Sequence, residues 1–399
     1  MVGLALEGGG ARGAFHMGAV KALLEEGYDF QGVAGTSIGA LNGALIAQGD
    51  FETGYRLWET LNSSIIFEMD EAKLRDILSR KIDRDTRTFL TAKIKQIIEN
   101  KGIDTSGIRK LLNDCIDEKK IRESPMDFGI VTVSLSDFKP LELYKEDIPE
   151  GRLVDYLMAS ANYPVFRIEP IDGKFYIDGG FYDNCPANLL IRKGYRKLVI
   201  VRTFARGIIR KLEDESVEVI RISPSEDLGS ILNFDEKMIQ NNLKLGYYDA
   251  MRAVRRLKGR KYYIEPVSDD YILESLLSIP DAVIEKLGRI MHISSMNPKR
   301  MLFERILPGL SETLRLRSSA TYQDIVMGAL EYLAEEKGLD KFRIRSFSEF
   351  LEDVRSLPAK AEEPSDSLLS IDAIRRKTRA VIFREDTLRE AARQFLDVL

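Results

Sequence analysis

The chain has 399 residues, 44% of them apolar and 31% charged, and this ordinary globular composition excludes collagen-like, low-complexity and wholly disordered proteins. Lys and Arg number 59 against 63 for Asp and Glu, so the net charge of -4 offers no overall attraction for nucleic acid, and we expect no nucleic-acid partner. Two cysteines, Cys115 and Cys185, are too few for a disulfide framework or for a zinc site. No apolar run approaches the roughly 18 residues of a membrane span, and no signal-peptide pattern is recognised. We therefore expect a cytoplasmic protein.

The first 50 residues predict two successive strand-helix pairs. Short apolar runs alternate there with helical periodicity, and glycines separate them. The predicted elements are a strand at 4–6, a loop at 8–13, a helix at 14–26, a strand at 30–34 and a helix at 38–48. Because strands and helices alternate, this part of the chain predicts a parallel α/β sheet.

The rest of the chain divides into three stretches of different character. Residues 52–122 are mostly helical and charged, which indicates an insertion or cap over one face of the sheet. Further strands are predicted at 128–135, 175–177, 197–203 and 218–222. From residue 256 the apolar spacing becomes helical. We therefore predict a catalytic domain at 1–255 and a mainly helical region of unknown role at 256–399.

A glycine-rich loop follows the first predicted strand. Gly8, Gly10 and Gly13 satisfy G-x-G-x-x-G between a strand and a helix, the context of a dinucleotide-binding loop. A dinucleotide site also needs an acidic residue at the carboxyl end of the second strand, whereas Asp29 precedes that strand. With Arg12 beside them, the same backbone N–H groups can instead stabilise negative charge that develops at a helix N-terminus. The loop alone leaves both interpretations open.

A second motif predicts a nucleophile. Gly35-Thr36-Ser37-Ile38-Gly39 matches G-x-S-x-G after an apolar strand and before a helix, the context in which this pattern forms a sharp elbow. The small residues Gly35 and Gly39 are sterically required there, and the turn exposes the Ser37 hydroxyl. The sequence therefore predicts Ser37 as a nucleophile.

The base that would activate Ser37 has three candidates. His16 lies inside the first helix, where a packed role is favoured over a catalytic one. His292 completes the Ser, Asp, His order of an α/β-hydrolase, although such a fold needs more strands before its nucleophile. Asp178 follows a short predicted strand, and Gly179 and Gly180 leave its carboxylate uncrowded. When Asp178 is considered alone, an ordinary Asp-Gly turn is the favoured explanation.

Four motifs stand in one order along the chain. They are GGGARG at 8–13, GTSIG at 35–39, ASANYP at 159–164 and DGG at 178–180. This order resembles the patatin-like phospholipases, and among them the bacterial patatin-like acyl hydrolases, over about residues 1–255. The resemblance implies a three-layer α/β/α fold with a mainly parallel central sheet, and a Ser-Asp dyad without histidine. Carried over by motif, it makes Ser37 the nucleophile and Asp178 its base.

The resemblance also implies an oxyanion hole and a substrate class. The hole would be formed by the loop residues Gly8, Gly9 and Gly10, with Arg12 nearby. The implied substrates are lipid acyl esters, phospholipids or lysophospholipids, and the chemistry needs no metal and no cofactor. Because an acyl chain must reach the site from a membrane or micelle, we expect transient contact with a lipid surface and a peripheral position at most.

Two stretches remain open. After Pro164 the chain continues with VFRIEP at 165–170, which departs from the family pattern and predicts a different wall near the acyl pocket. Residues 252–261 carry six cations, which suit either an anionic lipid surface or a solvated helix end. An α/β-hydrolase-like esterase using His292 and a nucleotide-binding regulatory module are the alternative functions.

Overall fold

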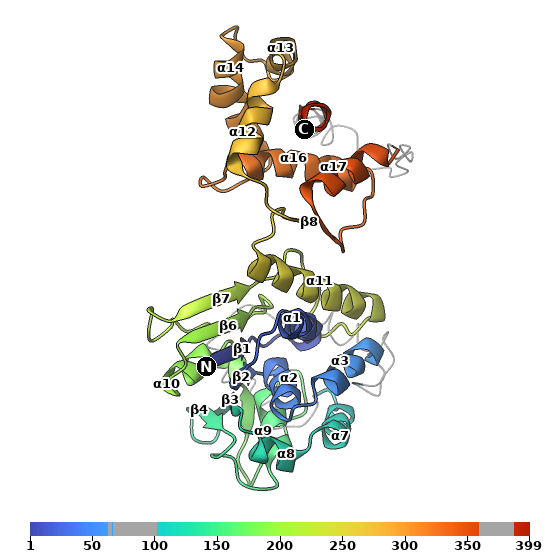
Figure 1. Ribbon diagram of the computed structural model, residues 1–399. Coiled ribbons are helices and arrows are strands. Elements are labelled where there is room, and N and C mark those ends of the chain that lie inside the picture. The colour runs from blue at the N-terminus through green and yellow to red at the C-terminus, as the bar shows by residue number, and fades with distance from the viewer. Residues whose placement is uncertain (63–65, 67–101, 359–386) are drawn as a thin grey trace, which may run out of the picture. The chain divides into compact units, whose positions relative to one another are not determined.

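The computed structural model describes residues 1–62, 66, 102–358 and 387–399 of the chain. They form two compact units, Met1–Val254 and Arg255–Leu399. The strands β1 to β7 all belong to the first unit, whereas helices dominate the second (Figure 1). The change from a strand-bearing to a helical part of the chain thus occurs near residue 255.

A seven-stranded sheet forms the centre of the first unit, in the order β4-β3-β2-β1-β6-β7 with β5 beside β3. Its strands are β1 (Val2–Leu6), β2 (Gly32–Thr36), β3 (Asp127–Ser134), β4 (Lys139–Tyr144), β5 (Tyr176–Asp178), β6 (Lys197–Val201) and β7 (Glu218–Ile222). Neighbouring strands pair in parallel except β4 and β5, which pair with β3 in the antiparallel sense. The predicted mainly parallel sheet is therefore confirmed.

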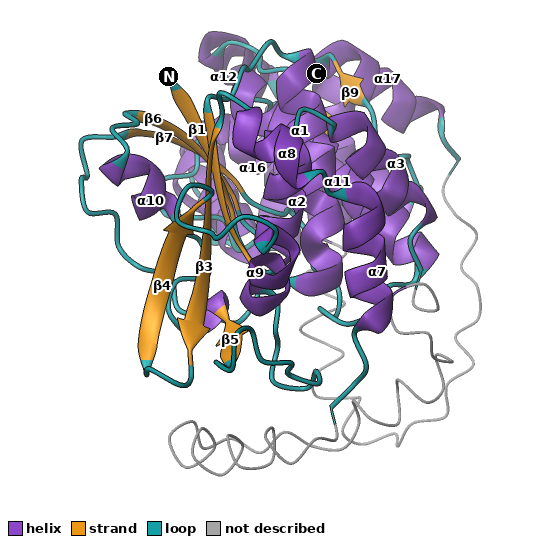
Figure 2. Ribbon diagram, turned by 90° about the horizontal axis from the view of Figure 1, so that it is seen from below, coloured by secondary structure: helices purple, strands orange, loops and turns teal. Residues whose placement is uncertain are grey.

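Helices cover both faces of this sheet. Figure 2 shows α10 (Ala187–Arg192) on one side, with α1 (Ala14–Glu25), α2 (Ile38–Ala47) and α9 (Leu153–Ser160) on the other. Leu189 and Leu190 of α10 pack against strand residues such as Ala5 and Leu198. The central strands β1 and β6 are accordingly almost continuous apolar runs, because neither of their faces meets water. This is the expected three-layer α/β/α arrangement.

Two differences from the predicted strands have local causes. Strand β4 was not expected, because its residues are exposed or half-buried at the edge of the sheet and lack a clear apolar alternation. Its pairing with β3 defines it instead. Strand β2 begins at Gly32 rather than at residue 30 and ends at Thr36, directly before the predicted nucleophile.

The carboxyl ends of the parallel strands define one edge of the sheet. β1 leads into the glycine loop, β2 leads directly into Ser37, and β6 leads into a loop that begins at Arg202. Parallel strands have the same direction, so these three segments leave the sheet at one edge. Both motifs identified in the sequence, the glycine loop and the elbow, therefore meet at this edge.

The region predicted as a helical cap is described only in part. Its described helices are α3 (Phe51–Thr60), α7 (Ser106–Cys115) and α8 (Glu118–Glu123). Residues 63–65 and 67–101 of the predicted insertion lie outside the described part of the chain. Helices α3 and α7 pack apolar side chains, among them Trp58, into a cluster with Phe166 and Phe234.

The second unit is a helical body with its own apolar core. Its helices are α12 (Asp269–Ser278), α13 (Asp281–Ile290), α14 (Pro298–Met301), α15 (Leu307–Thr313), α16 (Tyr322–Glu336) and α17 (Phe347–Ser356), with a further helical stretch at 387–398. Two short strands, β8 (Tyr263–Ile264) and β9 (Ile344–Arg345), pair in parallel. A capping box of Ser346 and Glu349 begins α17. No helix among the described residues is long and apolar enough to cross a membrane.

The basic run at 252–261 is largely engaged within the protein. Arg252 forms an ion pair with Asp249 at 2.7 Å, and the Lys261 ammonium pairs with Glu335. The Arg260 guanidinium donates to the Leu314 carbonyl at 2.8 Å. These contacts favour a structural role for the run over a free cationic surface.

A close crossing of α1 and α11 (Glu236–Arg255) provides a stability test. A Cβ added at Gly18 would overlap the backbone carbonyl of Leu243, and one added at Gly246 would overlap that of Phe15. Alanine would otherwise favour a helix over glycine by about 1 kcal/mol. Because backbone atoms must move apart here, we expect Gly18→Ala and Gly246→Ala each to destabilise the protein by about 1–3 kcal/mol in thermal or chemical unfolding.

Lys237→Ala, at an exposed position on α11, is the control and should change stability by less than about 0.5 kcal/mol. If either glycine variant is as stable as this control, the crossing does not require glycine.

Candidate active site

The backbone of Ser37 has a conformation that few residues adopt. Its φ is 56° and its ψ is -128°, and it is the N-cap residue of α2. Such a conformation costs about 1–3 kcal/mol and persists only where the surroundings enforce it. A Cβ at Gly35 would overlap the carbonyl of Gly39, and one at Gly39 would overlap that of Leu6. The two glycines of the elbow are therefore needed for close backbone packing on both sides of the serine.

Neighbouring polar groups hold the elbow in place. The Ser37 N–H donates to the hydroxyl of Ser160 at 3.0 Å, and that hydroxyl donates to the Val131 carbonyl at 2.7 Å. The Thr36 hydroxyl donates to the Asp183 carbonyl at 2.7 Å. Ser160 and Asp183 received no role from the sequence, because a side chain that supports another segment leaves no local pattern. Ser160 does fall within the motif at 159–164.

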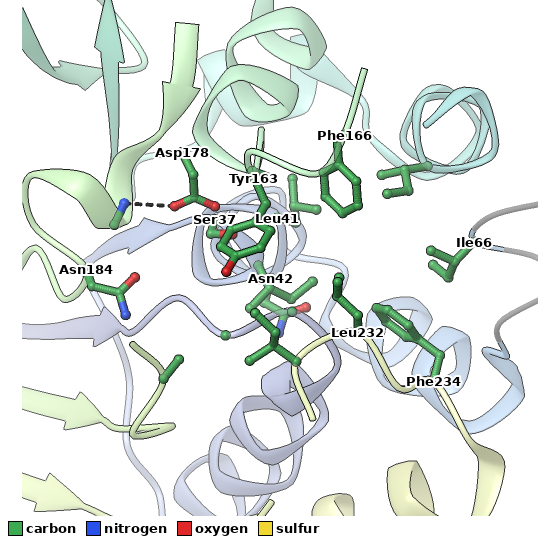
Figure 3. A pocket seen from close by; sticks show the side chains of 18 of the residues that line it. Ser37, Leu41, Asn42, Ile66, Tyr163, Phe166, Asp178, Asn184, Leu232 and Phe234 are labelled. Carbon is green, nitrogen blue, oxygen red and sulfur yellow. Dashed lines mark hydrogen bonds between the residues drawn. The ribbon is translucent and has the colours of Figure 1, made fainter. Parts of the chain in front are cut away.

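Asp178 and Ser37 line the same cavity, although the two residues are far apart in the sequence. Figure 3 shows the two side chains pointing toward each other at the cavity. Asp178 also accepts the Gly180 N–H at 2.8 Å, and its own N–H donates to the Asn162 carbonyl at 3.0 Å. Burial raises the pKa of Asp178 to about 6, although the neighbouring Ser37 side chain and the hydrogen bond from the Gly180 N–H oppose this shift.

The glycine loop has two backbone amides free for a ligand. Gly9 and Gly10 line the same cavity as Ser37, and among the described residues neither N–H has a protein acceptor. The Gly8 N–H donates to the Asn184 carbonyl at 2.9 Å, so the expected oxyanion role does not fit its amide. Gly8 instead shapes the loop, since a Cβ there would overlap the Asn184 side chain.

Arg12 has a different place from the one expected. Its guanidinium donates to the carbonyls of Gly229, Thr203 and Phe204 at 2.8–2.9 Å. These contacts tie the glycine loop to the segments after β6 and β7, so the Arg12 charge is used within the protein and does not line the cavity. Gly13 permits close packing, because a Cβ there would overlap the Ile38 side chain.

An apolar cavity of about 480 Å³ opens beside Ser37 and Asp178. Its lining includes Leu41 and Leu45 of α2, Trp58 of α3, Leu112 of α7, Phe166 and Phe234. Several of these apolar side chains surround the cavity in Figure 3. Asn42 also lines it, but its side chain accepts from the Trp58 indole at 2.9 Å and donates to the Gly13 carbonyl at 3.0 Å. The cavity therefore suits a long apolar group that ends at the serine.

The two histidines belong to different units of the protein. His16 is fully buried in α1, burial lowers its pKa to about 3, and its ring lies 3.3 Å from the Asn42 amide. This matches the packed role favoured from the sequence. His292 belongs to the second unit, after α13.

The structure also bears on the dinucleotide and metal alternatives. The residue after β2 is Ser37 rather than an acidic residue, and the Ala11 N–H of the glycine loop is occupied by the Ile231 carbonyl. This loop therefore lacks features that a dinucleotide site requires. Among residues 1–62, 66, 102–358 and 387–399, no group of three or more His, Cys, Asp or Glu side chains could hold a metal ion.

Comparison with known proteins identifies the family of the first unit. The family model described as patatin-like phospholipase matches residues 4–191. The first unit carries a patatin-like phospholipase domain. A patatin-like phospholipase domain-containing protein of Caenorhabditis elegans is 29% identical over 280 residues, which are 66% of this chain. Patatin-like phospholipase domain-containing protein 6 of Homo sapiens is 28% identical over 205 residues, or 50% of this chain.

The relatives are much longer than the region they share with this chain. The matched region covers 18% of the C. elegans protein, 13% of the human protein and 44% of an uncharacterized NTE family protein of Mycobacterium tuberculosis that is 27% identical over 186 residues. The solved structure of VipD from Legionella pneumophila is similar with a TM-score of 0.39 and 14% identity, covering 100% of this chain and 90% of that one. The family-model match over residues 4–191 assigns the patatin-like domain and leaves its substrate open.

The raised pKa of Asp178 predicts a pH-dependent effect on stability. A carboxyl group whose folded pKa lies above its unfolded value of 3.8 destabilises the folded state once it is ionised, and the penalty grows as the pH rises from about 4 to about 6. Asp178→Asn should therefore gain stability relative to the parent over this range and keep the gain above it, by up to about 3 kcal/mol. Thermal unfolding between pH 4 and pH 8 measures the difference.

Asp137→Asn is the control of opposite sign. The hydrogen bond from Lys174 lowers the pKa of this exposed carboxyl group, so its ionised form stabilises the protein at neutral pH and the stabilisation is lost as the pH falls. Asp137→Asn should lose stability at neutral pH. A stability difference between Asp178→Asn and the parent that does not change with pH would contradict the buried-carboxylate interpretation.

Proposed function

We propose that the patatin-like domain is a serine acyl hydrolase that cleaves lipid acyl esters, of phospholipase A or lysophospholipase type. The observation that carries this proposal is that the Ser37 side chain faces a buried Asp178 at one end of an apolar cavity. The family of the domain supports the same reaction class. The proposed substrates are phospholipids or lysophospholipids.

In the proposed mechanism Asp178 is the base. An aspartate with a pKa near 4 is a poor acceptor for a hydroxyl proton, whereas burial raises the pKa of Asp178 to about 6 and increases its basicity. The Ser37 Oγ forms a bond to the ester carbonyl carbon as its proton passes to Asp178. Asp178 then donates this proton to the leaving alcohol as the C–O bond of the ester breaks. In the second stage Asp178 accepts a proton from water, and the water oxygen attacks the acyl-enzyme and releases Ser37.

The proposed oxyanion hole consists of the Gly9 and Gly10 amides. Both line the cavity beside Ser37 and have no protein acceptor among the described residues. Ser37 is also the N-cap of α2, so the positive end of that helix dipole lies next to the reacting carbonyl. Preorganised donors of this kind stabilise the negative charge that develops in the transition state.

The acyl chain is proposed to follow α2 away from Ser37. Ile38, Leu41 and Leu45 of α2 line the cavity at a spacing that places them on one helix face. Ser37 to Leu45 spans about 12 Å at the usual helical rise. The far end lies near Cys115, which also lines the cavity and whose carbonyl accepts from the Gln48 side chain at 2.9 Å.

The dyad predicts the effect of single and double substitutions. Ser37→Ala and Asp178→Asn should each lower kcat for a phospholipid or lysophospholipid by about 10³-fold or more, and the double variant should be no worse than the poorer single variant. Mass spectrometry after fluorophosphonate treatment should find the label on Ser37 of the parent and on no residue of Ser37→Ala.

His292→Asn is the matched control for this experiment and should retain activity within about twofold. A histidine-dependent triad would instead lose about 10⁴-fold in kcat. Such a loss in His292→Asn, at unchanged thermal stability, would falsify the proposed dyad.

The proposed acyl path predicts a change in chain-length preference. Cys115→Phe adds bulk at the far end of the cavity, where the residue is only partly buried. We expect kcat/KM for long-chain p-nitrophenyl esters to fall by about tenfold or more, and kcat/KM for the butyrate ester to stay within about threefold, because a short chain stays near Ser37.

Cys115→Ser keeps the size of the side chain and is the control; it should leave the preference unchanged. Equal losses for short and long esters in Cys115→Phe would show that the acyl chain takes another path.

A further inference from the structure

The loop after β6 combines exposed apolar side chains with exposed cations at the mouth of the cavity. Phe204, Ile208 and Ile209 expose 56%, 54% and 41% of their surface. The side chains of Arg206, Arg210 and Lys211 are also exposed. Large exposed apolar residues close together on a protein surface mark an interaction site.

The backbone of this loop is held rigidly against the catalytic turn. The Ile208 N–H donates to the Gly180 carbonyl at 2.9 Å, and the Ile208 carbonyl accepts the Asn184 N–H at 2.6 Å. At the start of the loop, the fully buried Glu7 carboxylate accepts the N–H of Phe204 at 3.1 Å. The exposed side chains therefore project from a fixed backbone, and little ordering entropy opposes their binding to a partner.

The cations of the loop remain available for an external anion. Among the described residues, none of Arg206, Arg210 and Lys211 forms an ion pair, and the Arg210 guanidinium lies 4.6 Å from the centre of the Tyr182 ring. The acidic residues that follow are engaged elsewhere: Glu213 pairs with Arg192 at 3.0 Å, and Asp214 pairs with Arg196 at 3.6 Å.

We propose that residues 204–211 dock the patatin-like domain onto an anionic lipid surface, with Phe204, Ile208 and Ile209 entering the interface and the three cations contacting lipid phosphates and carboxylates. This inference rests on the proposed function. Arg206 and Ile208 line the cavity that holds Ser37, so the docking surface is continuous with the entrance that a lipid substrate would use. Exposed apolar and basic residues together are the combination that binds membrane interfaces.

The test measures binding separately from catalysis. Full-length Ser37→Ala protein is sedimented with phosphatidylcholine vesicles that contain or lack phosphatidylserine, at about 0.1 M and about 1 M salt. We expect binding that needs phosphatidylserine and falls at high salt. Adding Ile209→Asn, Arg210→Gln and Lys211→Gln should weaken that binding by about tenfold or more.

A matched control places the same changes at the opposite edge of the sheet. Leu24 is 41% exposed, like Ile209, near the end of α1, and Lys119 and Lys120 are exposed on α8, just before the start of β3. Leu24→Asn, Lys119→Gln and Lys120→Gln should together change vesicle binding by less than about twofold. The variant with Ile209→Asn, Arg210→Gln and Lys211→Gln is called the loop triple variant. If it is unstable in thermal unfolding, the double variant Arg210→Gln with Lys211→Gln must still weaken binding to phosphatidylserine vesicles.

Activity with Ser37 restored separates the two proposals. With Ser37 present, the loop triple variant should hydrolyse a soluble butyrate ester at the rate of the parent. It should lose activity only on phospholipids presented in vesicles. If the protein binds vesicles through this loop but hydrolyses no ester, the proposed function is contradicted and the docking proposal is still supported. The docking proposal is overturned if the loop triple variant binds vesicles as well as the parent does, or if the parent does not bind them. It is also overturned if light scattering shows that the parent is a dimer and the loop triple variant a monomer.

Discussion

The backbone conformation of Ser37 is the constraint on which the rest of the site depends. A φ of 56° at a residue with a side chain is unfavourable, and the fold tolerates it because Gly35 and Gly39 let backbone segments approach from both sides. The Ser160 hydroxyl oxygen accepts a hydrogen bond from the Ser37 N–H. The turn directs the hydroxyl away from the sheet and toward Asp178, so strain in one residue is balanced by packing of β1, β2, β3 and α9 around it.

Exclusion of water acts on this site in two ways. The apolar walls that would hold an acyl chain also desolvate Asp178, and desolvation raises its pKa to about 6. In the proposed mechanism one property of the cavity thus selects the substrate and strengthens the base. The same logic explains why His16 is no competitor: burial without an anionic partner lowers its pKa to about 3 and keeps the ring neutral.

The sequence predicted the site more fully than the roles of individual loop residues. Ser37 became the candidate nucleophile because an elbow needs small flanking residues, and Asp178 became its candidate base through the order of four motifs that resembles the family. Gly8 and Arg12 belong to the glycine loop in the sequence, yet the Gly8 amide donates to Asn184 and the Arg12 guanidinium to three carbonyls. These hydrogen bonds reach segments 176 to 217 residues away in the sequence, and such distant partners leave no pattern near the motif. The edge strand β4 was missed for a related reason, because its strand conformation depends on hydrogen bonding to β3 and not on its own sequence pattern.

The sequence by itself determined the mainly parallel α/β fold, the change to helices near residue 255 and the order of the motifs, because these depend on local periodicity and on glycines at tight turns. Tertiary structure alone decided that the Ser37 and Asp178 side chains face one cavity, and that the Gly9 and Gly10 amides have no acceptor within the described part of the chain. It also decided that residues 205–208 line this cavity. Each of these results from strands distant in the sequence ending at one edge of the sheet, and burial and hydrogen bonding there depend on neighbours that no local pattern specifies.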